Sequence, residues 1–357
     1  MVRTTVACCA VVLAGLIVGS EVHGQTVVLR QAPKLKFGAP TDSNSPTHWD
    51  GETFYVFNSA GHPVRSKGTS QFDIERDVRC EYDNEANGGR WIECTWRADD
   101  GTVYGWYHHE PRGLCPGTKL TAPKIGAARS KDNGAHWTDL GIVLEARPNT
   151  LDCDYKNGFF AGGNGDFSAM LDQQQRYLYL FISTYAGAVE EQGVSVARME
   201  WKHRDQPVGR VWKHYQGKWK EPGIGGRVTP IFQAKISWKE ENADAFWGPS
   251  VHWNTHLRKH VILLNRTRHK PGWPQEGVYI SHTANLANPT SWSKPEKILD
   301  GGSWYPQVLG VNAQAKETDK LCGKQARFYM HGVSEREMLF FKEGEDTSKL
   351  PPLYQPG

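Results

Sequence analysis

The sequence predicts an all-β fold, a five-bladed β-propeller with a central pocket. A strand-turn-strand pattern occurs four times along the chain, and the composition is rich in aromatic residues and glycine, with 14 Trp, 13 Tyr, 13 Phe and 37 Gly in 357 residues. Short aromatic and β-branched runs bounded by Gly, Asn, Asp or Pro are typical of β-strands. Repeats of such runs predict propeller blades, whose inner strands converge on one pocket.

The repeated pattern places polar or aromatic residues directly ahead of an apolar strand. Because the inner strands of a propeller surround one axis, we expect the residues at their heads to meet in the central pocket. The four copies begin at residues 42–51, 165–172, 247–253 and 304–310, and continue into strands at 54–59, 176–183, 260–265 and 326–332.

The expected strands divide the chain into five blades, although the pattern alone also allows four or six. Residues 64–94 are the least regular part, and they either complete blade one or form a charged excursion. The strands are 54–59 in blade one; 90–97, 103–108 and 124–130 in blade two; 166–171, 177–183, 193–199 and 211–219 in blade three; 249–253, 261–265, 277–281 and 292–299 in blade four; and 305–310, 326–332 and 338–342 in blade five.

Residues 130–137, Ser-Lys-Asp-Asn-Gly-Ala-His-Trp, fit the Asp-box pattern S-x-D-x-G-x-x-W. In such a hairpin Asp132 and Asn133 bond the backbone of their own turn, Gly134 takes a positive φ, and Trp137 packs under the turn. Asp boxes lie on the outer rim of propellers. We therefore expect a structural role here rather than a catalytic one.

The first 24 residues read as a secretory signal peptide. Arg3 supplies the positive end, residues 6–17 form an apolar run, and residues 22–24 form a cleavage site. The run is too short for a comfortable membrane span, with an uncleaved anchor as the alternative. Residues 25–357 lack a linker and predict a single propeller domain. We expect a secreted or periplasmic monomer with no membrane span after signal cleavage.

Charge and cysteine content narrow the expected partners. A formal net charge of +3 is too small to predict nucleic-acid binding. Disulfides are the default for cysteines of exported proteins. No C-x-x-C or H-x-x-x-H spacing appears, so we expect no metal and no cofactor. After loss of Cys8 and Cys9 with the signal, the local pairings are Cys80–Cys94 and Cys115–Cys153, leaving Cys322 over.

Two aspartates stand at equivalent positions of this repeat, at the start of the first strand of a blade. Asp42 precedes the first strand of blade one, and Asp166 lies at the head of an apolar strand in blade three. Paired carboxylates facing each other across a pocket are the arrangement that glycoside hydrolysis requires. The structural alternative is that each carboxylate bonds backbone amides of its own turn.

At these residues the chain resembles the five-bladed propeller glycoside hydrolases of family 43 and its relatives. Asp42, the Asp50-Gly51 turn and the following aromatic strand are similar to the segment that holds the general base in those enzymes. Asp166 matches the second aspartate, which raises the pKa of the general acid and orients it. One departure is clear: the general-acid glutamate of the family is replaced here by Trp247, in the triplet Trp247-Gly248-Pro249.

The resemblance implies a role for each carboxyl group. Asp42 is expected to be the unprotonated base or nucleophile, and Asp166 to raise the pKa of the acid by like-charge repulsion. Glu110, at the end of a blade-two strand, is the first substitute for the missing acid, with a surface ion pair as its alternative role. Glu276 and His252 are the reserves.

Aromatic and histidine side chains near the strand heads are expected to bind sugar, because the apolar face of a pyranose packs well on an aromatic ring. By strand alternation, one residue of the pair His108 and His109 is expected to face the core and the other the pocket. The expected substrate-binding residues are Trp49, His109, Trp247, His252, Trp304 and Tyr305, and Trp253 is a further candidate for stacking.

The leading hypothesis is a secreted glycoside hydrolase that acts on a carbohydrate substrate. A sialidase-like hydrolase is a second interpretation, prompted by the Asp box. It requires three arginines and a tyrosine nucleophile, for which Tyr305 with Arg266 or Arg327 are available. The third is a carbohydrate-binding propeller without catalysis, because Trp247 stands where the family has its acid.

Overall fold

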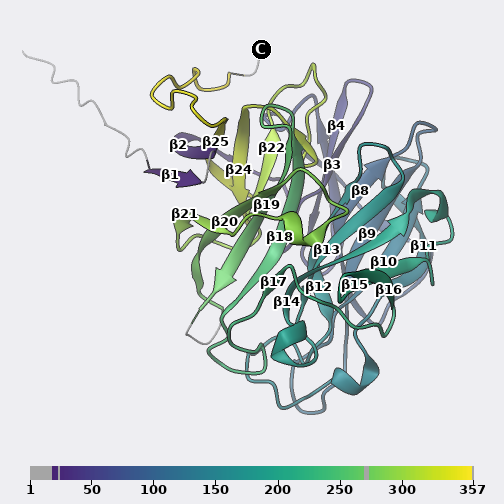
Figure 1. The fold of residues 1–357 in the computed structure, drawn as a ribbon. Coiled ribbons are helices and arrows are strands. Elements are labelled where there is room, and N and C mark those ends of the chain that lie inside the picture. Colours follow the sequence, from purple (N-terminus) through teal and green to yellow (C-terminus); the bar gives the residue numbers. More distant parts are fainter. Residues whose placement is uncertain (1–17, 23–24, 269–272, 356–357) are drawn as a thin grey trace, which may run out of the picture.

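Five sheets, antiparallel except for the short parallel pairings of β7 with β11 and β23 with β18, surround a central axis in a computed structural model that describes residues 18–22, 25–268 and 273–355 (Figure 1). The predicted all-β five-bladed propeller is confirmed. Residues 1–17 and 23–24 of the predicted signal peptide lie outside the described residues. No helix in the described ranges is long and apolar enough to cross a membrane.

Blade one is completed by the segment for which the sequence allowed two interpretations. Its inner strand β3 (Thr47–Asp50) pairs with β4 (Thr53–Ser59), followed by β5 (Pro63–Gly68) and β6 (Glu75–Arg79). Blade two runs from β8 (Gly88–Arg97) through β9 (Val103–Pro111) and β10 (Lys124–Ser130) to β11 (His136–Leu144), with β7 (Glu81–Tyr82) at its edge.

Blades three and four have four or more strands each, as predicted. Blade three contains β12 (Asn164–Leu171), β13 (Tyr177–Thr184), β14 (Gly193–Glu200), β15 (Val211–Tyr215), β16 (Lys218–Pro222) and β17 (Phe232–Gln233). Blade four contains β18 (Ala245–Asn254), β19 (Lys259–Thr267), β20 (Gln275–Thr283), β21 (Glu296–Asp300) and β23 (Leu321–Cys322). Four short 3-10 turns lie between strands, at Pro148–Thr150, Val189–Glu191, Trp201–His203 and Pro289–Ser291.

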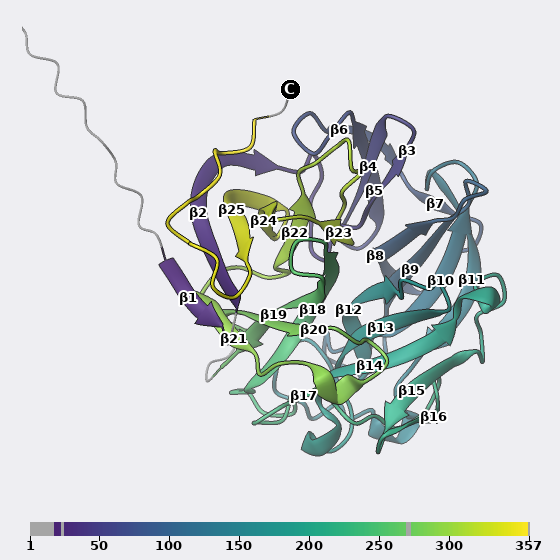
Figure 2. The ribbon, with the colours of Figure 1, turned by 45° about the horizontal axis from the view of Figure 1, so that its top comes forward.

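Blade five closes the ring with strands from both ends of the chain (Figure 2). β22 (Gln307–Gly310), β24 (Gln325–Met330) and β25 (Val333–Phe341) come from the C-terminal part. β2 (Gln25–Lys36) pairs antiparallel with β25, and β1 (Val18–Val22) pairs with β2. This pairing joins segments about 300 residues apart, and the sequence pattern did not predict it.

Apolar side chains fill the spaces between neighbouring blades. Between blades two and three, for example, Trp106 packs with Phe167 and Leu180, all of them buried. A second apolar cluster joins blades four and five, and a third joins blades three and four. Because each blade buries both faces against its neighbours, the innermost strands are fixed relative to one another, which makes their ends a rigid frame for side chains.

The predicted Asp box forms the expected hairpin, except that Asn133 does not bond its own turn: its Nδ2 donates to Asp50 Oδ2 at 2.8 Å. Ser130 Oγ accepts from the Gly134 amide, and Asp132 Oδ1 accepts from the amides of residues 135 and 136. Gly134 has a φ of 85°, and Trp137 Nε1 donates to the Gly134 carbonyl oxygen at 2.9 Å. The buried Trp137 ring meets Phe57 of blade one edge-on, so the box fastens blade two to blade one.

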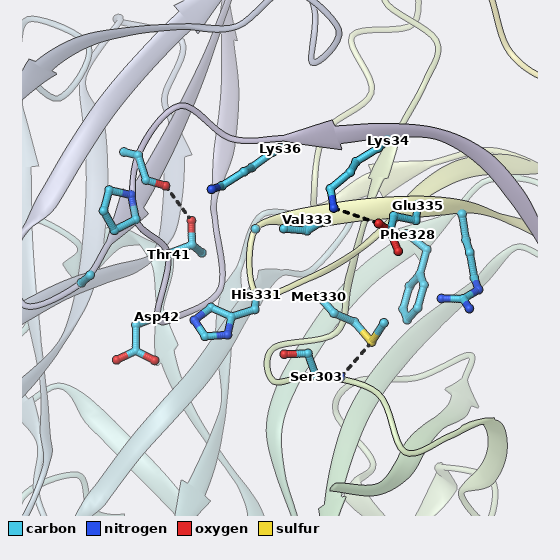
Figure 3. A pocket seen from close by; sticks show the side chains of 15 residues that line it. Lys34, Lys36, Thr41, Asp42, Ser303, Phe328, Met330, His331, Val333 and Glu335 are labelled. Atoms are coloured by element: carbon cyan, nitrogen blue, oxygen red, sulfur yellow. Dashed lines mark hydrogen bonds and ion pairs between the residues drawn. The ribbon is translucent and has the colours of Figure 1, made fainter. Parts of the chain in front are cut away.

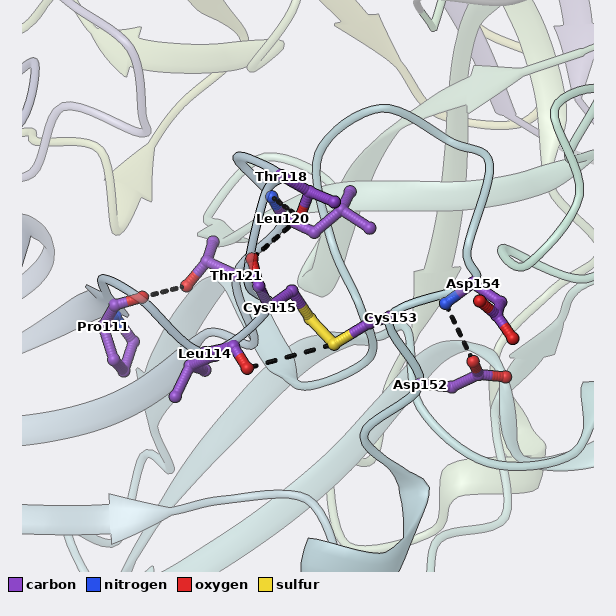
Figure 4. Close-up of a disulfide and its surroundings, with 9 residues drawn as sticks. All are labelled: Pro111, Leu114, Cys115, Thr118, Leu120, Thr121, Asp152, Cys153 and Asp154. Atoms are coloured by element: carbon purple, nitrogen blue, oxygen red, sulfur yellow. Dashed lines mark hydrogen bonds between the residues drawn. A yellow bond between two sulfur atoms is a disulfide. The ribbon is translucent and has the colours of Figure 1, made fainter.

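One of the two predicted disulfides is present. Cys115 and Cys153 are bonded and tie the β9–β10 loop of blade two to the connection between blades two and three (Figure 4). The predicted pairing of Cys80 with Cys94 is wrong, because both are buried free thiols in different places. Cys80 packs with the apolar residues beside Trp137, whereas the Cys94 thiol faces the Ala169 carbonyl oxygen of blade three.

Candidate active site

Carboxyl groups from three blades meet at the end of the channel where the innermost strands begin. Asp42 precedes β3 of blade one, and Asp166 stands near the start of β12 of blade three. Blade two contributes Glu93 from β8 and Glu110 from the end of β9. The structure therefore brings together all three predicted catalytic residues, Asp42, Asp166 and Glu110, around His108.

Asp166 is held in a strained and fully hydrogen-bonded position. Its φ is +38°, unusual for a residue with a side chain, and the strand register shifts beside it. Residues in this region cluster at functional sites because the conformation must be maintained by the surrounding structure. Tyr305 Oη donates to Asp166 Oδ1 at 3.1 Å, and Tyr185 Oη donates to Oδ2. Burial raises the pKa of Asp166, against the opposing effects of His108 and Tyr185.

The residue before Asp166 must be a glycine for the cluster to form. A Cβ atom on Gly165 would lie 2.6 Å from Cε1 of His108 and 2.8 Å from Cβ of Pro123. Real Cβ atoms do not approach so closely, so the backbone of blade three reaches the imidazole of blade two only through Gly165.

His108 lies at the centre of the carboxyl groups. Its Nε2 is 3.2 Å from Glu110 Oε1, and its Nδ1 is 3.3 Å from Glu93 Oε1 and 3.8 Å from Asp166 Oδ1. Burial by itself lowers the pKa of His108, but the contacts with Glu110 and Glu93 and the charge of Asp166 raise it well above its usual value. The acidic neighbours therefore favour the protonated imidazole, whereas the Asp166 amide, which points at Nδ1 from 3.0 Å, is accepted only by the neutral ring.

Glu93 is the buried carboxyl behind the histidine. Only 1% of the residue is exposed, and its Oε2 accepts from the Phe167 amide at 2.8 Å. The register of β8 shifts between Ile92 and Cys94, which turns the Glu93 side chain toward the cluster. Burial raises its pKa to about 7, although the bond to His108 acts in the opposite direction.

Asp42 is the carboxyl group that borders open space. It lines a cavity of about 660 Å³ whose other wall includes His331 and Ser303 (Figure 3). Its amide donates to the Ser59 carbonyl oxygen at 2.6 Å, which fixes the loop ahead of β3. Burial, and then the charges of Asp166 and Glu110, raise the pKa of Asp42 to about 7.

Three members of the cluster have the spacing of a cation site. One ligand atom from each of Glu93, His108 and Asp166 lies within 4.8 Å of the other two. The donor set of two carboxylates and an imidazole fits a divalent transition metal. The same atoms, however, already contact one another and the Phe167 and Asp166 amides. We therefore interpret the cluster through proton positions and charge.

Aromatic side chains surround this end of the channel. Trp247 meets Tyr305 and Trp304 edge-on, at ring-centre distances of 5.6 Å in both cases. Trp247 is buried, and its Nε1 donates to Gln275 Oε1 at 3.2 Å, so its ring is packed rather than presented to solvent. Trp304 is half-buried, and its ring is parallel to that of His331 in the Asp42 cavity. Of the predicted stacking tryptophans, Trp304 is therefore the one whose ring is best placed to contact a ligand near the Asp42 cavity.

Two histidines and a glutamate of the sequence-based prediction lie away from this cluster. His252 is fully buried inside the apolar contact of blades four and five, with its ring 5.5 Å from that of Phe340. His109 faces away from His108, and its Nδ1 lies 2.9 Å from the Gly89 carbonyl oxygen. Glu276 on β20 forms an ion pair with Lys297 on β21, in the outer part of blade four.

Trp49 and Trp253 lie at the opposite end of the channel. Both stand at the ends of innermost strands, β3 and β18, rather than at their heads. They line a separate hollow of about 360 Å³, which shares no residue with the Asp42 cavity. The structure therefore does not bring these two rings to the carboxyl groups.

The arginines of the sialidase interpretation also lie elsewhere. Arg266 forms a two-point ion pair with Asp244, at 2.8 and 2.9 Å. Arg327 donates to backbone oxygens of Pro33 and Ser334 within blade five. Tyr305, the expected nucleophile, is a buried hydrogen-bond donor to Asp166. These contacts give no support to a sialidase site.

Sequence reasoning missed Glu93 and Tyr185. A glutamate inside the otherwise apolar run at residues 90–97 was the available signal for Glu93, because a charge on an inner strand is rarely buried without a partner. Tyr185 follows β13 directly and has no distinctive local pattern. Its role depends on the fold, which places its hydroxyl beside Asp166.

No protein-family model and no curated protein matches the sequence. Solved structures that share its fold include the following three. A thermostable family-43 glycoside hydrolase has a TM-score of 0.53 at 12% identity, covering 92% of this chain and 98% of that chain. The endo-arabinase from Bacteroides thetaiotaomicron VPI-5482 has 0.51 at 10%, covering 88% and 99%. An exo-1,5-α-L-arabinanase from a bovine ruminal metagenomic library has 0.50 at 11%, covering 90% and 99%.

The chain also matches the exo-β-1,3-galactanase from Phanerochaete chrysosporium, with 12% identity and a TM-score of 0.47. The match covers 87% of this chain but spans only 64% of that chain. At such identities the likeness concerns the fold. The propeller described above is thus similar to that of solved family-43 glycoside hydrolases.

Proposed function

We propose that this protein is a secreted glycoside hydrolase that cleaves glycosidic bonds of poly- or oligosaccharides. The observation that carries the proposal is the convergence of Asp42 and Glu110 beside the buried pair Asp166 and His108, at the open end of the channel. Glycoside hydrolysis requires one carboxyl group that donates a proton and a second that acts as base or nucleophile. The disulfide between Cys115 and Cys153 is typical of exported proteins and supports secretion.

The electrostatics favour Asp42 as the proton donor. Its pKa of about 7 leaves the carboxyl group protonated in mildly acidic solution, and it borders the cavity where a leaving oxygen has room. The family resemblance implied the opposite roles, with Glu110 as the proton donor and Asp42 as the base or nucleophile. The structure favours the reverse assignment because the charges of Asp166 and Glu110 both act on Asp42.

Glu110 is then the base or the nucleophile. It forms an ion pair with His108 through Nε2, and Glu93 contacts the other ring nitrogen. In the reaction the Asp42 proton passes to the glycosidic oxygen as its bond to the anomeric carbon breaks. Glu110 takes a proton from the attacking water, or itself bonds the anomeric carbon before water releases it. His108, with its Nε2 at 3.2 Å from Glu110 Oε1, holds the Glu110 carboxylate in place for either step.

Asp166 acts on the reaction through Asp42. Two tyrosine hydroxyls, from Tyr185 and Tyr305, bind its oxygens, and its side chain is only 4% exposed, whereas that of Glu110 is 30% exposed. Its negative charge disfavours ionisation of Asp42 and keeps the acid protonated. Asp166 is therefore a positioning residue in this proposal, in agreement with the role that the family resemblance implied.

The proposal is tested by incubating the purified protein with aryl glycosides and neutral and acidic polysaccharides, and measuring released sugar by chromatography. We expect the wild type to release sugar from one substrate class, and Asp42→Asn and Glu110→Gln to release none. Glu276→Gln is the matched control, because Glu276 lies in an outer ion pair. Unchanged release by both variants would show that the carboxyl cluster is not the catalytic site.

A carbohydrate-binding propeller without catalysis is the second candidate function. The observation in its favour is Trp247, a packed tryptophan where the family resemblance has the general acid. This candidate predicts binding of a glycan in calorimetry with no released sugar between pH 4 and 9. Binding that Glu110→Gln leaves unchanged, without turnover by the wild type, would favour it over the hydrolase.

A further inference from the structure

A second hollow lies at the end of the channel opposite Asp42. It is formed where the innermost strands β3, β8, β12 and β18 end, and it has a volume of about 360 Å³, within the range of small-ligand sites. Along β12 alone, the five residue steps from Asp166 to Leu171 span roughly 17 Å. We call this site the distal hollow and define it by its lining residues Trp49, Thr95, Trp96, Arg97, Trp253 and Lys320.

Three tryptophans from three different blades form its walls. Each is half-buried and fixed from behind: the Trp49 Nε1 donates to the Glu317 carbonyl oxygen at 2.9 Å. Trp96 meets Trp201 edge-on at 6.3 Å, and Trp253 packs at 4.8 Å from His260. The rings therefore keep a constant orientation around the hollow, which lowers the entropy lost on binding a ligand.

Polar groups lie between the rings, and some have no partner in the described part of the chain. Thr95 is 2% exposed and lines the hollow, and its Oγ1 makes no hydrogen bond among the described residues. The Nε of Arg97 is likewise unpaired there. A buried hydroxyl without a partner is uncommon in folded proteins, and a ligand hydroxyl group reaches these two buried atoms once their side chains turn toward the hollow.

The charges of the hollow are already neutralised by neighbours. Arg97 pairs with Asp50 at 2.6 Å, and Lys320 pairs with the adjacent Asp319. Lys316, which lies over the Trp49 ring, pairs with Glu52 at 3.0 Å. A ligand therefore meets little net charge here, which disfavours phosphate groups, nucleic acid or acidic peptides.

From these contacts we infer that the distal hollow binds a neutral pyranose unit of a glycan, separately from the carboxyl cluster. The apolar face of the sugar packs on Trp96 or Trp253, and its hydroxyl groups bond Thr95 and Arg97. Such a site holds a polysaccharide chain without cleaving it. The site stands without the proposed function, because none of its residues belongs to the Asp42 cavity.

The test measures glycan binding by calorimetry with the Asp42→Asn/Glu110→Gln protein, so that turnover does not interfere. The probes are neutral polysaccharides and their oligosaccharides. We expect Trp96→Ala and Trp253→Ala to weaken binding at least 10-fold and Trp253→Phe to retain most of it. Trp212→Ala on the outer strand β15 is the matched control, since Trp212 is 44% exposed far from the hollow.

Each outcome decides the proposal. Weaker binding by both alanine variants, with unchanged near-ultraviolet circular dichroism, supports it whether or not the wild type releases sugar. Binding equal to that of the unsubstituted protein in both variants overturns it. So does an absence of binding to any neutral glycan in the Asp42→Asn/Glu110→Gln protein, because the distal hollow is intact in that protein.

Discussion

The two ends of the central channel are built from the same innermost strands but carry opposite chemistry. At the end where the strands begin, Asp42, Glu93, Glu110 and Asp166 gather around one imidazole, and two of the carboxyl groups have pKa values raised to about 7. At the other end tryptophans surround a hollow whose cations are paired. The first end stores unfavourable charge, whereas the second presents rigid apolar surface.

The acidic end of the channel lowers the stability of the fold, whereas the distal hollow does not. Carboxyl groups with raised pKa values are destabilising once they ionise, and Asp166 adds a strained φ of +38°. Nothing comparable is stored in the paired ions of the distal hollow. Strongly raised pKa values cluster at functional sites, which is why we propose this end for the chemistry.

The largest effect is expected from removing the base at the acidic end. Glu110→Gln should lower the rate of glycan hydrolysis by about 10³-fold, since acid-base catalysis of this kind contributes 10²–10⁴-fold. Trp253→Ala at the other end should leave hydrolysis of a small aryl glycoside unchanged. Initial rates of both variants check this contrast. Equal losses in the two variants would break the distinction between the two ends.

The disulfide should stabilise the acidic end. Cys115 lies in the β9–β10 loop, and Cys153, 38 residues further along the chain, lies in the β11–β12 connection that also carries Phe160, which packs against Tyr185. The Cys115→Ser/Cys153→Ser variant should lose about 3–4 kcal/mol of unfolding free energy. Urea unfolding with and without dithiothreitol measures it: the reductant should destabilise the wild type and leave the variant unaffected. A wild type that is insensitive to reduction would contradict the prediction.

Asp42→Asn should stabilise the fold in alkaline solution while abolishing hydrolysis. The pKa of Asp42 is about 7 in the folded protein, above its usual 3.8, so the cost of its charge builds up between about pH 4 and pH 7 and is complete above pH 7. The variant removes that charge and should gain on the order of 2 kcal/mol at pH 8, with little gain at about pH 3, where the carboxyl group is protonated in both states.

Urea titrations at both pH values test this stability difference. Asp300→Asn, at a position whose side chain is 91% exposed, is the control and should change neither value. A destabilised Asp42→Asn protein at pH 8 would mean that the charge of Asp42 is not opposed by Asp166 and Glu110 as described.

The rate of hydrolysis should fall in alkaline solution as Asp42 loses its proton. If Asp42 donates the proton, the rate falls about tenfold for each pH unit above its pKa of about 7. Asp166→Asn removes one of the charges that raise this pKa, so the alkaline limb should move to lower pH. Rate profiles of both proteins measure the shift, and a shift to higher pH would contradict it.

The smallest effect is expected from a single tyrosine hydroxyl. Tyr305→Phe removes one hydrogen bond to Asp166 and should lower activity about tenfold, equivalent to about 1.4 kcal/mol. Tyr329→Phe is matched to it, because the buried hydroxyl of Tyr329 on β24 bonds Gln71 of the β5–β6 connection in blade one, away from the cluster. Similar rates for the two variants would remove the positioning role of Tyr305.

The sequence predicted the fold and the main carboxyl groups because both have local signals. Strand heads such as Asp42 and Asp166 follow turn residues directly, and Cys115 and Cys153 are neighbours among the cysteines. The contact of β2 with β25, the bulge that turns Glu93 inward, and the meeting of Tyr185 with Asp166 depend on distant segments. Trp49 was misplaced for a simpler reason: it ends its strand rather than heading it.

One assay decides whether the acidic end of the channel is a glycosidase site, as we propose. Sugar released from a panel of polysaccharides is measured by chromatography for the wild type, Asp42→Asn and Trp253→Ala. We expect the wild type and Trp253→Ala to release sugar at similar initial rates on short substrates, and Asp42→Asn to release none. Release by Asp42→Asn at the wild-type rate would contradict this proposal.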